Sequence, residues 1–318
     1  MPLASPLVFF GTPEFALPTL AALAGAGRAP LRVVTQPCRP AGRGQRIRPS
    51  PVAQWAVEHG LPVLQPERVR EPGFLAELAA LRPAVAVVVA FGQIFPRPLL
   101  ELPDQGCINL HASLLPLYRG ASPIQAAVAA GETVTGVTTM LMEEGLDSGP
   151  ILLQEETPIG PRETAGELGG RLAQMGGRLM LETLSRLERG ELVPRPQDAA
   201  RATFAPRLTR ASGRVDWTAS AAALANRLRA FTPWPGLTAE LRGAPVKLLR
   251  VEPLPEPAAP GAPAAGTILG LRGGGSLAVA CGDGSTLGIE ELQRPGRRAQ
   301  PAAEFVHGER LRPGESFT

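Results

Sequence analysis

A continuous apolar run at residues 85–91, VAVVVAF, constrains the fold of this chain more than any other segment. An apolar run of this kind suits a central strand of a parallel sheet, because helices then cover both of its faces. Further strands are predicted at 7–10, 31–35, 107–112, 136–142 and 151–155, with helices between them at 14–25, 51–59, 72–81 and 122–130. This alternation predicts an α/β domain, a Rossmann-like open and mainly parallel sheet with helices on both faces.

The turn after the first strand favours a helix start but not a dinucleotide site. Thr12 can cap a helix, Pro13 suits its first position, and Glu14 complements its dipole. The fingerprint G-x-G-x-x-G is missing from this turn. An NAD-dependent enzyme is therefore disfavoured.

The second half of the chain changes pattern. Residues 163–190 predict a long helix, in which two glycine pairs mark candidate breaks. Residues 191–206 then predict a linker between a catalytic domain, 1–190, and a second domain, 207–318. The second domain has a predicted helix at 219–230 and five short predicted strands near 237–242, 245–251, 266–270, 276–281 and 286–291. These strands favour a small OB-like β-barrel.

Positive charge gathers in two places. Residues 207–318 contain 14 Lys and Arg against 10 Asp and Glu, and residues 36–51 contain four arginines and no acidic residue. The arginines of this loop are Arg39, Arg43, Arg46 and Arg48. The loop is either a solvated connection or a mobile basic segment that becomes ordered on a phosphate backbone.

Cysteine and hydropathy patterns bear on the cellular setting. The three cysteines, Cys38, Cys107 and Cys281, lie far apart and show neither a zinc spacing nor a disulfide framework. No segment is apolar enough to span a membrane, and the start lacks the pattern of a signal peptide. We therefore expect a cytoplasmic protein that needs neither a metal nor a membrane, and we expect a monomer.

The strongest chemical pattern is Asn109-Leu110-His111. On a strand, residues two apart face the same side. An amide N–H can stabilise an oxyanion and an imidazole can move a proton, so this pair fits attack on a carbonyl carbon. The alternative is a buried histidine whose ring bonds a backbone carbonyl.

Asp147 lies in the glycine-rich turn of EEGLDSGPIL. A turn aspartate commonly bonds its own backbone. The alternative is that it lies beside His111, where a carboxylate would orient the imidazole and favour its charged form. Spacing in the sequence does not distinguish these two possibilities.

Several stretches together closely resemble the 10-formyltetrahydrofolate-dependent formyltransferases, and among them the methionyl-tRNA formyltransferases. They are 9–20 FFGTPEFALPTL, 33–52 VVTQPCRPAGRGQRIRPSPV, 87–132 with CINLHASLLPLYRGASP, 136–152 GVTTMLMEEGLDSGPIL, 204–217 FAPRLTRASGRVDW, 229–236 RAFTPWPG and 279–284 VACGDG. The Asn-x-His pattern with its downstream Asp is common to the whole superfamily. The basic loop and the second domain indicate the tRNA-modifying members.

This resemblance implies a reaction and its residues. A formyl group would move from 10-formyltetrahydrofolate, the co-substrate, to the α-amino group of methionine on initiator methionyl-tRNA. The implied catalytic residues are Asn109, His111 and Asp147, and Phe15 would lie beside the methionine side chain. The implied formyl-folate-binding residues are Phe91, Gly92, Ile94, Ser113, Leu114, Leu115 and Pro116. The implied tRNA-binding residues are Arg39, Arg43, Arg46, Arg48 and Arg207.

Three positions depart from the family pattern: Cys38 replaces an acidic residue, Arg207 replaces a lysine, and Tyr118 replaces a common tryptophan. Arginine and lysine differ in hydrogen-bonding geometry, so a specific contact at Arg207 is in doubt. Two other readings stay open at this point. One is another formyl-folate enzyme, either a nucleotide-sugar formyltransferase or a formyl-folate hydrolase. The other is a non-catalytic tRNA-binding protein.

Overall fold

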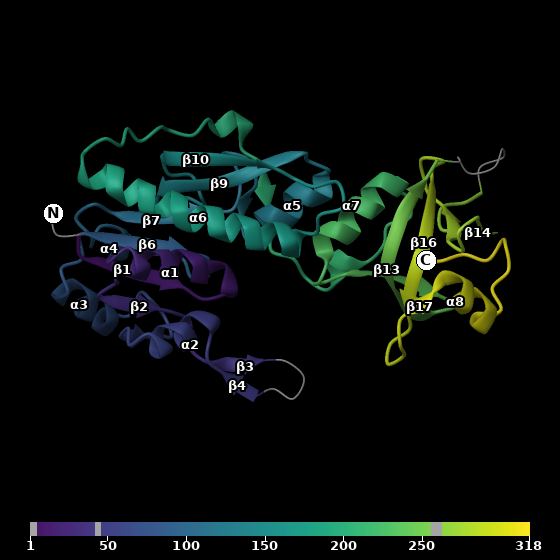
Figure 1. The fold of residues 1–318 in the computed structure, drawn as a ribbon, viewed down its shortest axis with the longest axis horizontal. Coiled ribbons are helices and arrows are strands. Elements are labelled where there is room, and N and C mark those ends of the chain that lie inside the picture. Colours follow the sequence, from purple (N-terminus) through teal and green to yellow (C-terminus); the bar gives the residue numbers. More distant parts are fainter. Residues whose placement is uncertain (1–4, 42–45, 256–262) are drawn as a thin grey trace. The chain divides into compact units, whose positions relative to one another are not determined.

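A computed structural model describes residues 5–41, 46–255 and 263–318 of the chain, which divides into two compact units (Figure 1). The first unit comprises Met1–Pro123, Val134–Pro158 and Gly169–Ala205, and the second comprises Ile124–Thr133, Ile159–Leu168 and Pro206–Thr318. The predicted linker 191–206 thus lies almost wholly within the first unit. The predicted domain boundaries themselves stay a prediction.

The first unit is built on a seven-stranded sheet with the order β10-β9-β7-β6-β1-β2-β5. The strands from β7 to β5 are parallel, whereas β9 and β10 add an antiparallel edge. Their bounds are β1 Leu7–Gly11, β2 Arg32–Val34, β5 Val63–Leu64, β6 Val85–Val89, β7 Cys107–His111, β9 Val134–Leu141 and β10 Ile151–Pro158. Two short pairs stand apart from it, an antiparallel hairpin of β3 Arg39–Ala41 with β4 Arg46–Arg48, and a parallel pair of β8 Arg119–Gly120 with β11 Phe204–Ala205.

Helices cover the sheet, which confirms the predicted α/β fold. The helical elements up to residue 201 are η1 Glu14–Ala16, α1 Leu17–Gly25, α2 Pro51–Glu58, α3 Pro72–Ala80, α4 Arg97–Leu100, α5 Pro123–Ala130, α6 Ala165–Glu188 and η2 Ala199–Arg201. All five residues of β6 are buried, as its apolar run predicts. Ala86 and Val88 of this strand pack in one core cluster with Phe74 and Leu78 of α3.

The glycine pairs do not break α6, which runs without interruption from Ala165 to Glu188. A Cβ on Gly176 would come within 2.3 Å of the Leu110 side chain of β7, and one on Gly177 within 2.9 Å of the Pro18 carbonyl oxygen. The second pair therefore serves close packing of α6 against the sheet and against α1. The prediction of helix breaks was wrong, because a glycine inside a helix can also be required for close packing against a neighbouring element.

The second unit carries an antiparallel sheet with the order β12-β13-β16-β15-β14, and β17 pairs with β16. The bounds are η3 Ala211–Gly213, α7 Ala221–Phe231, β12 Leu237–Leu241, β13 Ala244–Leu254, β14 Ile268–Leu271, β15 Leu277–Ala280, β16 Thr286–Gln293, β17 Gln300–Pro301 and α8 Ala302–Glu309. The C-terminal tail joins the two edge strands, because Thr318 exchanges backbone hydrogen bonds with Glu240 of β12 and the Glu315 carbonyl accepts one from Ile268 of β14. The sheet is thereby closed through the tail, in keeping with the predicted small barrel.

Candidate active site

One face of strand β7 is apolar at the start of the strand and polar toward its carboxyl end. Cys107 at its start is buried in the core cluster, where it pairs with Ala86 of β6. The next two residues on the same face are Asn109, which is half-buried, and His111, which is buried. In open parallel sheets, binding sites form beyond the carboxyl ends of the strands. The predicted Asn-His pair therefore lies on one face of β7, at the end where a site is expected.

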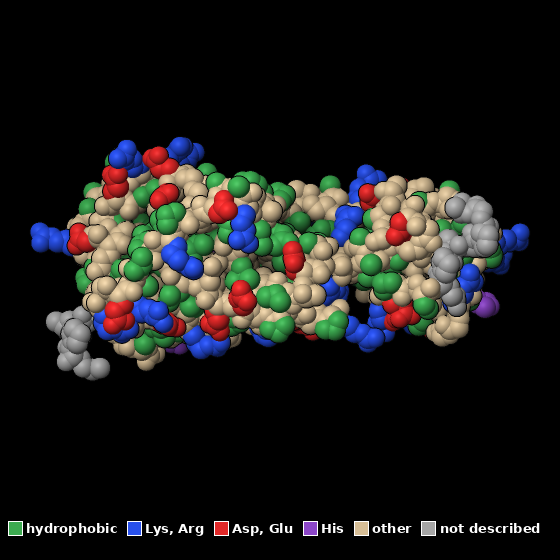
Figure 2. Space-filling view, turned by 90° about the horizontal axis from the view of Figure 1, so that it is seen from above, with side chains coloured by type: hydrophobic (Ala, Val, Ile, Leu, Met, Phe, Trp, Pro, Cys, Tyr) green, Lys and Arg blue, Asp and Glu red, His purple; other side chains and the backbone are tan. Residues whose placement is uncertain are grey.

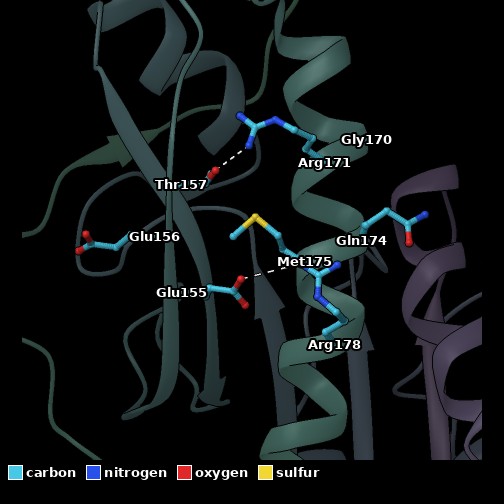
Figure 3. A pocket seen from close by; sticks show the side chains of 8 residues that line it. All are labelled: Glu155, Glu156, Thr157, Gly170, Arg171, Gln174, Met175 and Arg178. Atoms are coloured by element: carbon cyan, nitrogen blue, oxygen red, sulfur yellow. Dashed lines mark hydrogen bonds and ion pairs between the residues drawn. The ribbon is translucent and has the colours of Figure 1, made fainter.

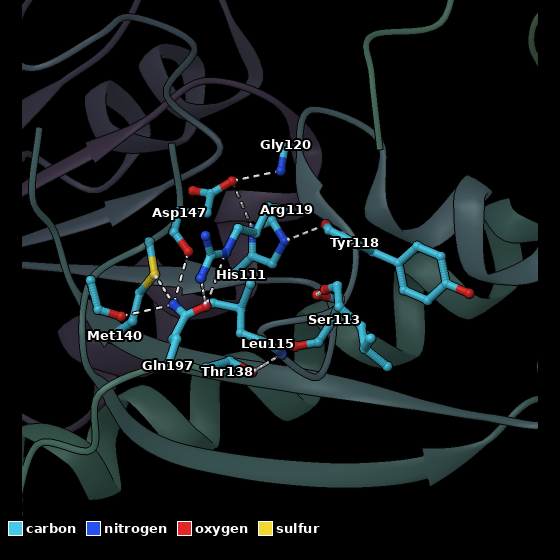
Figure 4. Close-up of polar contacts among 12 residues, drawn as sticks. His111, Ser113, Leu115, Tyr118, Arg119, Gly120, Thr138, Met140, Asp147 and Gln197 are labelled. Atoms are coloured by element: carbon cyan, nitrogen blue, oxygen red, sulfur yellow. Dashed lines mark hydrogen bonds and ion pairs between the residues drawn. The ribbon is translucent and has the colours of Figure 1, made fainter. Parts of the chain in front are cut away.

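The His111 imidazole has an acceptor beside each ring nitrogen (Figure 4). Nε2 lies 3.0 Å from the carbonyl oxygen of Tyr118, and because a carbonyl only accepts, Nε2 donates in this bond. Nδ1 lies 3.7 Å from Oδ2 of Asp147. The structure thus brings His111 and Asp147 together, and a proton on Nδ1 would face a carboxylate.

Asp147 is held in the left-handed backbone region, with φ +48°. Few residues other than glycine, asparagine and aspartate adopt this conformation readily. Its carboxylate Oδ2, the oxygen nearest His111, accepts a hydrogen bond of 2.7 Å from the Gly120 backbone N–H. This bond reaches the short strand β8, 27 residues away in the chain, so the carboxylate does more than stabilise its own turn.

The segment Ser113–Pro116, predicted to bind formyl-folate, directly follows β7 and is held by internal hydrogen bonds. The Ser113 hydroxyl donates to the Leu117 carbonyl at 2.6 Å, and the Thr138 hydroxyl donates to the Ser113 carbonyl at 2.6 Å. Gln154 of β10 donates to the Leu115 carbonyl at 2.9 Å. Leu115 is buried, whereas Leu114 and Pro116 are half-buried. The segment is therefore rigidly placed, with its serine hydroxyl engaged by the protein.

The other predicted formyl-folate residues follow β6. The Phe91 ring lies in the core, 5.3 Å from the Phe10 ring in an edge-to-face contact, and its carbonyl accepts from Thr12 and Gln36. Gly92 has φ +87°. Ile94 is 91% exposed. Any contact of Phe91 with a ligand would thus come from its backbone, whereas the Ile94 side chain is open to one.

The predicted methionine-pocket and tRNA-binding residues belong to other elements of the chain. Phe15 is half-buried in η1. Arg39 begins β3, Arg46 and Arg48 belong to β4, and Arg43 falls outside the described residues. Arg207 is exposed in the second unit. On the face of the molecule in Figure 2, basic and acidic side chains are interspersed, so this face shows no continuous basic field.

Sequence reasoning missed three residues that the structure places at the site: Arg119, Gln197 and Thr203. Arg119 is buried and its guanidinium donates twice to the Gln197 side-chain oxygen, at 3.0 and 2.7 Å (Figure 4). Thr203 accepts from the Tyr118 N–H at 2.8 Å. Gln197 and Thr203 fall in the predicted linker, where no local pattern distinguishes a buried contact from a solvated loop.

A hollow of the first unit, about 580 Å³ in volume, lies between β10 and α6 (Figure 3). None of the predicted site residues lines it. Its arginines serve the protein itself: Arg171 donates to the Thr157 hydroxyl at 2.6 Å and to the Pro158 carbonyl at 2.7 Å, and Arg178 lies 3.9 Å from Glu155. The chemistry-bearing side chains thus gather at the end of β7 and not in this hollow.

The part of the chain that the structure describes has neither a metal-binding cluster nor a membrane-spanning helix. Within the described ranges, no group of three or more His, Cys, Asp or Glu side chains is arranged to hold a metal ion. Among those same residues, no helix has the length and apolar character needed to cross a bilayer. The expected monomeric state and cytoplasmic location stay predictions.

Two family models match the chain. The model described as formyl transferase matches residues 7–184, and the model described as formyl transferase, C-terminal domain, matches residues 207–310. The two matched ranges contain all the predicted site residues, whereas residues 185–206 lie between them.

Curated relatives match over nearly the full length. A methionyl-tRNA formyltransferase of Citrifermentans bemidjiense is 49% identical over 308 residues, covering 97% of this chain and 95% of the relative. A methionyl-tRNA formyltransferase of Synechococcus sp. (strain JA-3-3Ab) is 50% identical over 320 residues, covering 98% of each chain.

Solved structures share the fold at much lower identity. An N-formyltransferase of Helicobacter canadensis, in complex with folinic acid and dTDP-3-aminofucose, gives a TM-score of 0.66 at 17% identity, covering 90% of this chain and 98% of that one. HypX of Aquifex aeolicus, in complex with tetrahydrofolic acid, gives a TM-score of 0.60 at 17% identity, covering 95% of this chain and 47% of that one.

Proposed function

The chain belongs to the formyl transferase family, and from this premise we propose that it formylates the α-amino group of methionine on initiator methionyl-tRNA, with 10-formyltetrahydrofolate as the formyl donor. The observation that carries the proposal is identity of about half the residues with methionyl-tRNA formyltransferases, extending over 97% and 98% of the chain. The second unit is included in that match. The proposed function thus covers the whole chain.

The alternatives have less support. The N-formyltransferase solved in complex with folinic acid and dTDP-3-aminofucose shares the fold at 17% identity, whereas the methionyl-tRNA formyltransferases are 49% and 50% identical. A non-catalytic tRNA-binding protein would have no need of the His111–Asp147 pair. This chain has all three residues that the family resemblance implies as catalytic, Asn109, His111 and Asp147.

We propose the following chemistry for the site. The neutral amine of methionine attacks the formyl carbon, so a C–N bond forms and the formyl oxygen becomes an oxyanion. The Asn109 amide N–H stabilises that oxyanion by a hydrogen bond, and the positive charge of a protonated His111 stabilises it electrostatically, since both ring nitrogens face acceptors of the protein. When the intermediate collapses, the bond from the formyl carbon to N10 of the folate breaks. The amine has then lost one proton and N10 has gained one.

We propose that His111 and Asp147 assist the transfer of that proton from the amine to N10. The Nδ1–Oδ2 separation of 3.7 Å is longer than a hydrogen bond. Catalytic hydrogen bonds are often long without substrate and shorten in the reacting complex. In our proposal Asp147 orients the ring and balances the charge on His111 as the proton moves. Formyl-folate binds along Ser113–Pro116 and the exposed Ile94, and Phe15 contacts the methionine side chain.

The test of this site uses His111→Asn and Asp147→Asn, with His307→Asn and Asp104→Asn as matched controls, since both control side chains are exposed. We expect each site variant to lower kcat for formylation of methionyl-tRNA by roughly 10²–10⁴-fold. The controls should retain wild-type turnover. Folded site variants with near-normal turnover would contradict the assignment. A wild-type protein that formylates no methionyl-tRNA would contradict the function itself.

A separate test addresses the basic loop, to which we assign tRNA binding through Arg39, Arg43, Arg46 and Arg48. Arg43→Ala is expected to raise KM for methionyl-tRNA about tenfold or more, because one phosphate-binding cation is lost, and to leave the Kd for the folate unchanged. Arg70→Ala, at another exposed arginine, is the control. Equal weakening of tRNA and folate binding by Arg43→Ala would contradict the assignment.

A further inference from the structure

Residues 195–205, here called the strap, pack along the candidate site within the first unit. At one end, Arg195 and Ile151 of β10 exchange two backbone hydrogen bonds of 2.8 Å. At the other end, β11 pairs in parallel with β8, and the Ala205 carbonyl accepts from the Ser122 N–H. The strap is thus fastened on either side of the residues that surround His111.

The strap holds the first partner of the His111 ring, the carbonyl of Tyr118. The Tyr118 N–H donates to the Thr203 hydroxyl at 2.8 Å, and the Arg119 N–H donates to the Thr203 carbonyl at 2.8 Å. Thr203 therefore fixes the backbone on both sides of the carbonyl that accepts from His111 Nε2.

The strap also holds the second partner of the His111 ring, Asp147, through the side chain of Gln197. Nε2 of Gln197 donates to the carbonyl oxygens of Asp147 and Gly149, both at 2.8 Å. Oε1 of Gln197 accepts the two hydrogen bonds from the buried Arg119 guanidinium. Every strong hydrogen-bonding position of the amide is thus used, and a flipped amide would set N–H groups against the guanidinium.

These bonds form a closed circuit. Asp147 Oδ2 accepts from the Gly120 N–H, the neighbouring Arg119 binds Gln197, and Gln197 returns to the Asp147 backbone (Figure 4). The circuit fixes Asp147 at both its carboxylate and its carbonyl, although its backbone is in the less favoured left-handed region. We propose that Gln197 is a positioning residue for formyl transfer, which sets the carboxylate of Asp147 against His111. This inference rests on the proposed function.

Gln197→Met removes the amide while keeping the length of the side chain. We expect kcat for formylation to fall about 10- to 100-fold, the effect of a displacement on the order of 1 Å at a catalytic group. KM for formyl-folate and for methionyl-tRNA should change less than about threefold, because Gln197 acts through Asp147 and not on either substrate. Gln174→Met, at an exposed glutamine of α6, is the control and should behave as wild type.

The decisive measurement is a double-mutant cycle with Asp147→Asn. If Gln197 acts by positioning the Asp147 carboxylate, Gln197→Met should lower kcat by less than about threefold in the Asp147→Asn background. Losses that multiply in the double variant would indicate a general structural role and overturn the inference. A Gln197→Met single variant with wild-type kcat would overturn it as well.

Gln197→Glu keeps the test open if the methionine variant does not fold. A carboxylate can still bind Arg119 but cannot donate to the Asp147 and Gly149 carbonyls, so the strap stays attached while the turn is released. We expect kcat to fall as for Gln197→Met, and an unchanged kcat would contradict the inference. Failure of the proposed function is distinguishable from these outcomes, because the wild-type protein itself would then lack formylation activity.

Discussion

Alanine at Gly177 is expected to destabilise the first unit, although alanine is the better helix former. The propensity gain from glycine to alanine inside a helix is about 1 kcal/mol. Against it stands the new Cβ, which would lie 2.9 Å from the Pro18 carbonyl oxygen and 3.4 Å from the Thr19 Cα. Both are backbone atoms of α1, so no side-chain rotation relieves the contact, and overpacking of this kind costs about 1–3 kcal/mol.

Gly170 supplies the matched control within the same helix. It is exposed, and a Cβ placed on it meets no atom within 4 Å. Gly170→Ala should therefore raise the free energy of unfolding by about 0.5–1 kcal/mol. Because the propensity term is common to both variants, the difference between them isolates the cost of the contact with α1.

The assay is urea unfolding of the two variants and the wild type, followed by far-UV circular dichroism at 25 °C. The free energy of unfolding of Gly177→Ala should lie below that of Gly170→Ala by about 1–3 kcal/mol, with equal m-values. Equal stability of the two variants would refute the reasoning, since it would mean that α6 and α1 do not approach closely at Gly177.

Two further predictions follow from ionisable groups. Arg28 donates to Glu188 at 2.7 Å and thereby lowers the pKa of that carboxyl, so the pair stabilises the fold above the unfolded-state pKa of Glu188 and loses its effect as the pH falls through the lowered value. Glu188→Gln should lower the free energy of unfolding by about 0.5–1 kcal/mol at pH 7 and by nearly nothing at strongly acidic pH, as measured by urea titration. The control Glu156→Gln, at an exposed residue, should have wild-type stability at every pH, and a loss of stability in Glu188→Gln that does not depend on pH would contradict the prediction. Burial raises the pKa of the Cys107 thiol to about 12, whereas Cys38 is exposed, so iodoacetamide at pH 8 should label Cys38 and leave Cys107 unmodified in native protein by mass spectrometry. Equal labelling of the two would show that β7 opens readily.

The parallel sheet was predictable because its signal is local and repeated. The predicted strands β1, β6 and β7 each bury an apolar run, and the helical patterns between such runs leave few alternatives to a βα arrangement. The edge strand β5 was not predicted, because its two residues are only half-buried and form no such run. The same reasoning found the Asn109–His111 pair, since a spacing of two on a strand fixes a common face. It could not place Asp147 against His111, because a turn residue's distant partner depends on how two loops meet.

The strap illustrates the limit of sequence reasoning most clearly. Gln197 and Thr203 act through hydrogen bonds to residues 50 and 85 positions away, and neither residue type indicates such a distant contact in the sequence. One sign of this contact does lie in the sequence of β8, the strand that pairs with the strap. Gly120 has φ +116°, and a Cβ there would lie 2.7 Å from the Ala205 carbonyl oxygen, so the glycine after Arg119 is required for β8 and β11 to meet. A glycine of this kind indicates that another backbone segment approaches closely. Which segment approaches becomes clear only from the fold, in which residues 191–205 pack back onto the rest of the first unit. The segment that looks most like a passive connection is therefore the one that closes the hydrogen-bond circuit around His111 and Asp147.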